Sequence, residues 1–368
     1  MEGPRPVKKE ELADLINLIN YVFRTSSGKM PDMQICFPLF LSEKNLEHLL
    51  IMADNGQPVS HTGLWLNDFQ YFSQTMKVGY LGSVCTEPNY RGMGLATTLM
   101  EAVLNHLEEN GVDLLLVSGG RGLYQQAGCL KEGSVNWYSI PKQAPDCRFD
   151  ITINPPVALM NELWIKEPLH SKRSLSNFEA LVEAAALARC IDRESKVYLA
   201  GTMDTPLAYI QAVHGHDGSV FIYEWAGERT VLIEIAAFIA SLPNSKEVRW
   251  PIPSWEKALL SLMPKIKGIA KDTEKLSGTY KIVRFASFID KISNYLSERY
   301  GLSPIKGCDQ EEFQALYYED EALKLKPKDM QKMLLSGVLP ANIPPKMKEA
   351  FLQALPLPLP WPIGFDFI

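Results

Sequence analysis

The chain has 368 residues, of which 46% are hydrophobic and 22% charged, and its formal net charge is −6. This is the composition of a globular protein, and the length predicts two or three domains rather than a single core. A net negative charge argues against nucleic acid as a partner. The sequence has no run of about 18 uncharged apolar residues, the length that a membrane-spanning helix needs.

The cysteines are spread along the chain without a CxxC pair, which argues against a zinc site and against a disulfide framework. We therefore expect reduced thiols and no metal centre. The first residues, MEGPRPVKKEELADL, contain no apolar signal segment, so we expect a cytoplasmic location and no membrane partner. The cysteines are Cys36, Cys85, Cys129, Cys147, Cys190 and Cys308.

The first predicted element is a helix over about residues 7–23, VKKEELADLINLINYVF, because its apolar residues recur at helical spacing. Two strands follow in LEHLLIMADNGQPVSHTGLWL, joined by a turn at Asn55 and Gly56. A third strand is predicted in KVGYLGSVCT. The order at the start of the chain is therefore helix, hairpin, strand.

A second helix is predicted from Leu95, Leu99, Val103 and Leu107, with Gly111 where a helix-ending glycine belongs. The apolar strand VDLLLVS follows it directly. Strand, helix and strand within about 40 residues form a parallel crossover. The sequence thus predicts an α/β domain with a mixed sheet over residues 1–150.

The same order of elements returns over residues 151–280 with little similarity of sequence. FEALVEAAALARCI predicts a helix, SKVYLAG and TPLAYIQAV a hairpin, SVFIYEWA a strand, TVLIEIAAFIAS a helix and EVRWPIP a closing strand. We interpret this part as a degenerate second copy of the first domain. Residues 281–368 predict a small third domain, with one amphipathic helix, two shorter helices and a proline-rich tail.

The segment richest in chemical signals is VGYLGSVCTEPNYRGMGLATTLMEAVL, where a strand passes through a glycine-containing turn into a helix. Glycines let the backbone approach a ligand, and the free N–H groups of a helix start bind anions. A P-loop is excluded because no Gly-Lys-Ser/Thr ending is present. A dinucleotide fingerprint is disfavoured because Thr97 stands where a third small residue is needed, and because Glu87 to Arg91 separate the strand from the first glycine.

The pattern Arg-x-x-Gly-x-Ala, from Arg91 to Ala96, resembles the acetyl-CoA pyrophosphate loop of the GCN5-related N-acetyltransferase superfamily. In that superfamily a Tyr-x-x-x-Gly arrangement follows the next strand, and LLLVSGGRGLYQQAGC supplies Tyr124 and Gly128 there. The alternative interpretation is an ordinary tight turn and a core tyrosine. The resemblance implies that acetyl-CoA is bound by Val84, Cys85, Thr86, Arg91, Gly92, Met93, Gly94, Leu95, Ala96 and Thr97.

The implied reaction is direct transfer of acetyl to an amine, which must lose a proton before it attacks. By the resemblance, Tyr124 is the acid that protonates the departing thiolate. A covalent route through Cys85 would need an activating histidine or cation that the local sequence does not offer. His48 and His61 lie in apolar strand patterns and His214 and His216 flank a turn, so no histidine stands out as the base.

The order of the three domains resembles that of the enhanced intracellular survival acetyltransferases and their bacterial relatives, which acetylate aminoglycosides or lysines. The resemblance implies a sterol-carrier-like last domain, an oligomer, often a hexamer, and a terminal carboxylate, here that of Ile368, as general base. A tail that only caps the third domain is the alternative for PWPIGFDFI. Asp366 is a candidate for drawing a cationic amine toward the tail.

The second copy reads WAGERTVLIEIAAF where the glycine loop would recur, and it lacks the spaced glycine and the small residue after Gly227. One coenzyme A site per chain is therefore predicted. The leading hypothesis is an acetyl-CoA-dependent N-acetyltransferase acting on a small-molecule or peptide amine. The rival is a non-catalytic sensor that binds coenzyme A or a lipid, and the sequence leaves the acceptor and the acyl chain length open.

Overall fold

The computed structural model describes residues 1–142, 144, 148–202, 204–310 and 312–368. The chain forms two compact units, each built from separated segments. The first contains Met1–Glu132, Ser277–Pro362 and Ile368, and the second contains Gly133–Leu276 and Ile363–Phe367. The described cysteines Cys36, Cys85, Cys129, Cys190 and Cys308 form no disulfide with one another, while Cys147 lies outside the described residues.

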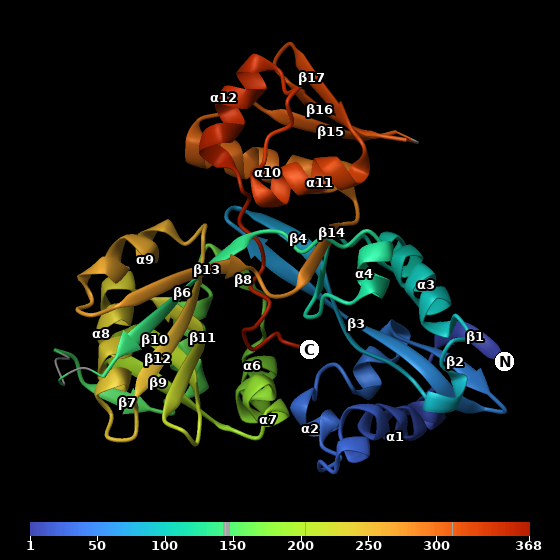
Figure 1. Ribbon diagram of the computed structural model, residues 1–368, viewed down its shortest axis with the longest axis horizontal. Helices are drawn as coiled ribbons and strands as arrows, with labels where there is room; N and C mark the ends of the chain where they lie inside the picture. The colour runs from blue at the N-terminus through green and yellow to red at the C-terminus, as the bar shows by residue number, and fades with distance from the viewer. Residues whose placement is uncertain (143, 145–147, 203, 311) are drawn as a thin grey trace. The chain divides into compact units, whose positions relative to one another are not determined.

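The sheet of the first unit follows the order β1-β2-β3-β4-β5-β14 (Figure 1). Its neighbours pair antiparallel except β4 and β5, which are parallel as the crossover pattern predicts. The predicted turn at Asn55 and Gly56 joins β2 to β3. The strands are β1 (Glu2–Pro6), β2 (Leu49–Asp54), β3 (Gln57–Tyr71), β4 (Gln74–Thr86), β5 (Leu114–Val117) and β14 (Thr279–Ile282).

Helix α3 (Leu95–Glu109) connects β4 to β5 and packs its apolar face on the sheet. Leu99, Val103 and Leu107 are fully buried, as their spacing predicts. Gly111 has φ +69°, the left-handed conformation that ends helices and favours glycine. The other helical segments of this part are α1 (Leu12–Phe23), α2 (Met33–Cys36) and α4 (Gly122–Gln126), with 3₁₀ turns at Lys9–Glu11, Thr25–Ser27, Glu43–His48 and Pro88–Tyr90.

The C-terminal part of the first unit begins with β14, which pairs antiparallel with β5 from Thr279 to Ile282. Helix α10 (Phe285–Tyr300) follows, and Lys291 on it makes an ion pair with the buried Asp113. A three-stranded antiparallel sheet then forms that the sequence patterns did not predict. Its strands are β15 (Ile305–Asp309), β16 (Gln314–Tyr318) and β17 (Glu321–Leu325), followed by α11 (Pro327–Ser336) and α12 (Pro345–Ala354).

The sheet of the second unit follows the order β13-β6-β12-β11-β10-β9-β7. Strand β6 falls inside the range predicted for the first domain, yet it pairs with β12 and β13 of this sheet. A hairpin, a strand, helix α8 (Arg229–Ser241) and a parallel strand occur in the predicted order. The strands are β6 (Ser134–Pro141), β7 (Ile151–Ile153), β9 (Glu194–Gly201), β10 (Pro206–His214), β11 (Ser219–Gly227), β12 (Glu247–Pro253) and β13 (Ala270–Lys275).

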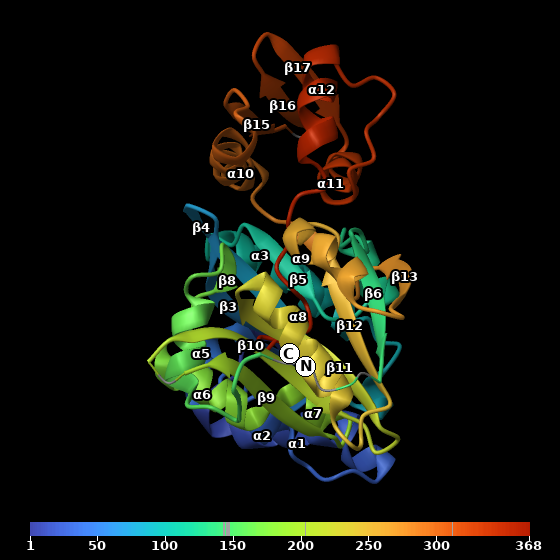
Figure 2. The same cartoon turned by 90° about the vertical axis from the view of Figure 1, so that its left-hand side faces the viewer.

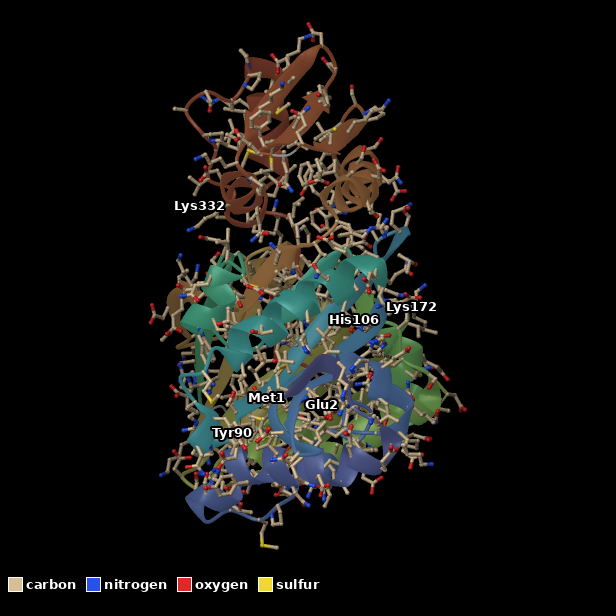
Figure 3. The ribbon with its side chains drawn as sticks, turned by 90° about the vertical axis from the view of Figure 1, so that its right-hand side faces the viewer. Met1, Glu2, Tyr90, His106, Lys172 and Lys332 are labelled. Carbon is tan, nitrogen blue, oxygen red and sulfur yellow. The ribbon has the colours of Figure 1, made fainter. Side chains whose placement is uncertain are left out.

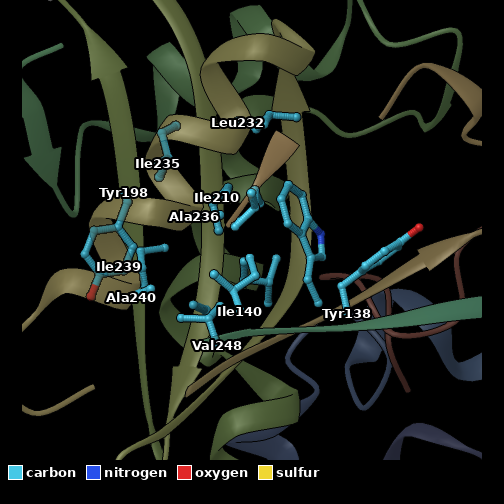
Figure 4. Packing of buried hydrophobic residues seen from close by; sticks show 14 of the residues in the cluster. Tyr138, Ile140, Tyr198, Ile210, Leu232, Ile235, Ala236, Ile239, Ala240 and Val248 are labelled. Carbon is cyan, nitrogen blue, oxygen red and sulfur yellow. The ribbon is translucent and has the colours of Figure 1, made fainter. Parts of the chain in front are cut away.

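Helix α8 lies against the sheet of the second unit (Figure 2), and the buried residues of its core come from both. Ile235 and Ile239 of α8 pack with Ile140 of β6, Ile210 of β10 and Val248 of β12 (Figure 4). The helix predicted over 178–191 is divided at Ala185, which has φ +44°. The remaining elements are α5 (Val157–Trp164), β8 (Leu169–Ser171), α6 (Leu175–Ala184), α7 (Ala186–Cys190), α9 (Lys257–Leu262) and a 3₁₀ turn at Met263–Lys265.

Residues Ile363–Phe367 belong to the second unit, where Asp366 makes an ion pair with the buried Arg173 and the ring of Phe365 lies 5.5 Å from its guanidinium. Arg173 donates two hydrogen bonds of 2.9 Å to Glu224 and two, of 2.6 and 3.2 Å, to Asp366. The Glu224 carboxylate also accepts the N–H of Phe365 at 2.8 Å and the hydroxyl of Tyr209 at 3.0 Å. Asp366 is therefore already paired with a cation, so it is not a free anion for an incoming amine.

Candidate functional site

The glycine loop contains two glycines in the left-handed backbone conformation. Gly92 and Gly94 have φ of +82° and +78°, and a side chain built at either position would meet nothing within 4 Å. Glycine is needed there for the backbone conformation rather than for space. Gly94 is the N-cap of α3, and Arg91 donates from Nε to the main-chain oxygen of Thr86 at 3.2 Å.

The start of α3 presents a row of backbone donors. Among the described residues, the N–H groups of Gly92 through Ala96 have no acceptor, whereas those of Thr97 and Thr98 donate to the Gly94 oxygen at 3.0 and 3.1 Å. Such a row at the start of a 15-residue helix favours an anion. The sequence predicts that Thr97 binds acetyl-CoA, but its N–H is already hydrogen bonded within the first turn of α3.

The chain segment that precedes the glycine loop is held by Asp54. The hydroxyl of Tyr90, labelled in Figure 3, donates to Asp54 at 2.9 Å, and the amino group of Met1 lies 3.5 Å from the same carboxylate. Glu87 caps the 3₁₀ turn by accepting the N–H of Asn89 at 2.9 Å. These bonds hold the short connection between β4 and the glycine loop.

Strands β4 and β5 separate before β4 ends. Their pairing stops at Leu81 and Val117, while β4 continues to Thr86. The backbone from Gly82 to Thr86 therefore has no strand partner on that side within the described residues, and Val84, Cys85 and Thr86 lie in it. An extended ligand chain is able to pair with such a free strand edge.

The last residue, Ile368, lies at this separation. Its main-chain oxygen accepts a hydrogen bond of 2.8 Å from the hydroxyl of Ser118, directly after β5. A side chain built on Gly82 would lie 3.0 Å from the Ile368 carbonyl carbon and 3.1 Å from its Cγ1. Glycine at position 82 thus leaves the space that Ile368 occupies.

Replacing Gly82 with alanine should displace Ile368 from its seat. We expect carboxypeptidase to release Ile368 at least about tenfold faster from Gly82→Ala than from the wild type, because cleavage follows the population of the open tail. Gly120→Ala is the matched control, since a side chain there meets nothing within 4 Å. Equal release rates in all three chains would show that Ile368 does not rest on Gly82.

Tyr124 lies on α4 and is 6% exposed. Its ring lies close to Gly119, the residue after Ser118. A side chain built on Gly119 would lie 3.3 Å from Tyr124 Cε2. Burial raises the pKa of its phenol above the ordinary value, an effect that Arg121 opposes. Tyr124 therefore keeps its proton at neutral pH and has a proton to donate.

The other candidates from the sequence are Cys85 and the histidines, and all but His216 are buried or hydrogen bonded within the fold. Burial raises the pKa of the Cys85 thiol to about 12, so Cys85 is not a thiolate nucleophile at neutral pH. His48 shares a 2.8 Å hydrogen bond with His106 of α3. His214 was predicted to be solvated, but it is half-buried and hydrogen bonded to the Tyr198 hydroxyl at 2.9 Å. The second histidine predicted to flank that turn, His216, is exposed.

His61 is fully buried, and burial lowers its pKa to about 4. An unfolded histidine titrates near 6.5, so below that pH the unfolded chain binds a proton that the folded chain excludes. We expect the free energy of unfolding to fall as the pH drops from about 6.5, with a loss of about 3 kcal/mol by pH 4. Urea titrations at several pH values measure this loss, and a His61→Gln chain, which lacks the titrating group, should show a smaller one. An identical pH dependence in both chains would contradict it.

The corresponding helix start in the second unit is filled by acidic side chains. Glu167 accepts the N–H of Gly227 at 2.8 Å, and Arg229 makes ion pairs with both Glu167 and Glu256. A side chain built on Gly227 would meet the main-chain oxygen of Leu207 at 2.2 Å. The Glu167 carboxylate is thus bound to the Gly227 amide just before α8 and to the side chain of Arg229.

Over the described residues, His, Cys, Asp and Glu side chains form no group of three or more arranged to hold a metal ion. In the same part of the chain, none of the helices has the length and apolar character needed to cross a membrane.

Comparison with known proteins agrees with this geometry. Residues 3–130 match the model of the acetyltransferase (GNAT) domain. A probable N-acyltransferase from Enterococcus faecalis V583 shares the fold with a TM-score of 0.65 and 16% identity, over 90% of this chain and 89% of that one. A GCN5-related N-acetyltransferase from Anabaena variabilis has a TM-score of 0.62 and 16% identity over the same shares.

Eis1 from Mycobacterium abscessus also shares the fold, with a TM-score of 0.60 and 11% identity, over 91% of this chain and 90% of that one. None of the curated proteins matches the sequence. The shared fold extends well beyond residues 3–130 and covers most of both units.

Proposed function

We propose that the chain, in which residues 3–130 match the acetyltransferase (GNAT) domain, transfers acetyl from acetyl-CoA to a primary amine by direct attack. The observation that carries the proposal is that several features of the candidate site meet at one strand edge. The free donors of Gly92–Ala96, the unpaired edge of β4, Tyr124 and Ile368 all lie around the separation of β4 and β5.

Each part of the cosubstrate has a matching feature. The pyrophosphate would accept hydrogen bonds from the N–H groups of Gly92 to Ala96, and the pantetheine arm would pair with the backbone of Val84, Cys85 and Thr86. Arg91 would add positive charge to this end of the site. The α8 start, occupied by Glu167, supports a single coenzyme A site per chain.

The reaction needs one base and one acid. The amine nitrogen attacks the thioester carbonyl carbon, the C–S bond breaks, and the products are an amide and coenzyme A. Tyr124 would give its phenol proton to the departing thiolate and regain one from solvent. In a chain that ends at Ile368, the terminal carboxylate held by Ser118 would take the proton from the amine.

The wider architecture is part of the same proposal. We propose that residues 151–280 are a degenerate second acetyltransferase-like domain, because hairpin, strand, helix and parallel strand recur there in the order seen in the first unit. Residues 281–368 would form the small sterol-carrier-like part, with α10 to α12 around a three-stranded sheet. Oligomer formation by the chain remains a further proposal.

The experiment that tests the function is a screen for thiol release. Acetyl-CoA is offered with kanamycin, with a lysine-containing peptide and with simple alkyl amines, and coenzyme A release is followed together with the mass of the acceptor. An acceptor that gains an acetyl group supports the proposal. Tight binding of coenzyme A with no acetylation of any amine would favour the rival sensor function.

A further inference from the structure

One residue of β4 has a backbone conformation that its side chain disfavours. Ser83 has φ +47°, in the left-handed region that non-glycine residues rarely adopt. His61 pairs with Cys85 and Gly63 with Gly82, so Ser83 and Val84 both lie opposite the single residue Thr62. This is a β-bulge, and such bulges change the direction in which a strand presents its backbone.

The bulge lies between the two parts of the candidate site. On one side of it, Gly82 contacts Ile368. On the other side begin Val84, Cys85 and Thr86, whose backbone is proposed to pair with pantetheine. A change in the conformation of Ser83 would therefore move the strand edge that receives the cosubstrate.

A buried histidine holds Ser83. His61 Nδ1 lies 3.0 Å from the main-chain oxygen of Leu50, and its Nε2 lies 2.9 Å from Ser83 Oγ. Because a carbonyl oxygen only accepts, Nδ1 carries the proton, and Nε2 must accept the hydrogen bond from the Ser83 hydroxyl. The burial that lowers the pKa of His61 to about 4 keeps the ring neutral and this arrangement fixed.

From this geometry we propose that His61 is a positioning residue for the cosubstrate, which holds Ser83 in the left-handed conformation and so sets the backbone of Val84–Thr86. The inference rests on the proposed function, since it assigns pantetheine to that backbone. The alternative role for the same Ser83–His61 contact is that of a serine nucleophile with its base. His61 is a poor base for that purpose, because the charged ring would be completely buried.

Two pairs of variants separate these roles, with binding of coenzyme A itself as the readout. Glycine adopts φ near +50° without cost, so Ser83→Gly keeps the bulge without the hydroxyl, while Ser83→Ala loses the hydroxyl and keeps the backbone cost. We expect the Kd for coenzyme A, measured by calorimetry, to rise about fivefold in Ser83→Ala and to stay within about twofold of wild type in Ser83→Gly.

The second pair changes the histidine. A glutamine side chain places an acceptor near the Nε2 position, whereas asparagine reaches only the Nδ1 position. His61→Gln should therefore bind coenzyme A nearly as wild type does, and His61→Asn about fivefold more weakly. Adding Ser83→Gly to His61→Asn should restore binding, because glycine does not need to be held. Circular dichroism melts confirm that each variant is folded.

The outcomes are distinct. If the wild type does not bind coenzyme A, the proposed function fails. If it binds and Ser83→Gly is as weak as Ser83→Ala, or if none of the variants changes the Kd, the positioning role of His61 is wrong. An acetyl adduct on Ser83, detected by mass spectrometry of wild type incubated with acetyl-CoA, would replace that role with the nucleophilic one.

Discussion

Tyr124→Phe should lower kcat for amine acetylation by about 10²- to 10⁴-fold, the range of general acid–base catalysis. Phenylalanine keeps the buried ring beside Gly119 and removes only the hydroxyl. The departing thiolate would then have no donor in place. The measurement is steady-state thiol release, with coenzyme A affinity determined separately to show that binding is unchanged.

The pH dependence of the acetylation rate is an independent test of Tyr124 as the acid. Burial raises the pKa of Tyr124, so the phenol remains protonated to a pH above its ordinary value near 10. Activity that depends on this acid should fall only at alkaline pH, and the fall should be absent from the residual activity of Tyr124→Phe. Tyr295→Phe on α10 is the matched control and should retain the wild-type kcat. If Tyr124→Phe is as active as that control, another group supplies the proton.

Two glycines added after Ile368 should lower kcat by about 10²- to 10⁴-fold if the terminal carboxylate is the base. The extension moves the carboxylate by up to about 7 Å and leaves an uncharged peptide carbonyl beside Ser118. A peptide carbonyl does not accept a proton from an amine at neutral pH, whereas a carboxylate, with a reference pKa near 3.5, is ionised and able to do so.

The control for this extension is an insertion of the same two glycines between Glu319 and Asp320, in the turn from β16 to β17. That chain has the same added length with the Ile368 carboxylate unchanged, and its activity should remain. If the extended chain is fully active, the tail has only a structural role and the base must be sought elsewhere. Unfolding curves of both chains show that neither change disturbs the fold.

The sequence predicted the local elements well, because their signals are local. The helical spacing of Leu99, Val103 and Leu107 and the Asn55-Gly56 turn each depend on neighbours within a few residues. The strands at 305–325 were missed because they are short and carry charged residues on the exposed face, such as Lys306 and Lys324. Their pattern in isolation resembles a polar loop.

The residues missed at the site are those defined by contacts between distant segments. Ser118 meets Ile368 across 250 positions, and Arg173 meets Asp366 across 193. The left-handed Ser83 results from a register shift between β3 and β4, and no local pattern signals such a shift. Tyr124 and the glycine loop could be named as candidates from the sequence, because their pattern depends on spacing along one continuous segment.

The discontinuity of the two units has a consequence for synthesis of the chain. Strand β14 reaches the edge of the first sheet only after residue 282 has been made, although β5 is complete by residue 117. The Glu224 carboxylate receives its bond from the Phe365 amide still later. On the ribosome, the nascent chain must therefore hold an unpaired edge of β5 until residue 282 has been made and an incompletely bonded buried carboxylate until residue 365 has been made.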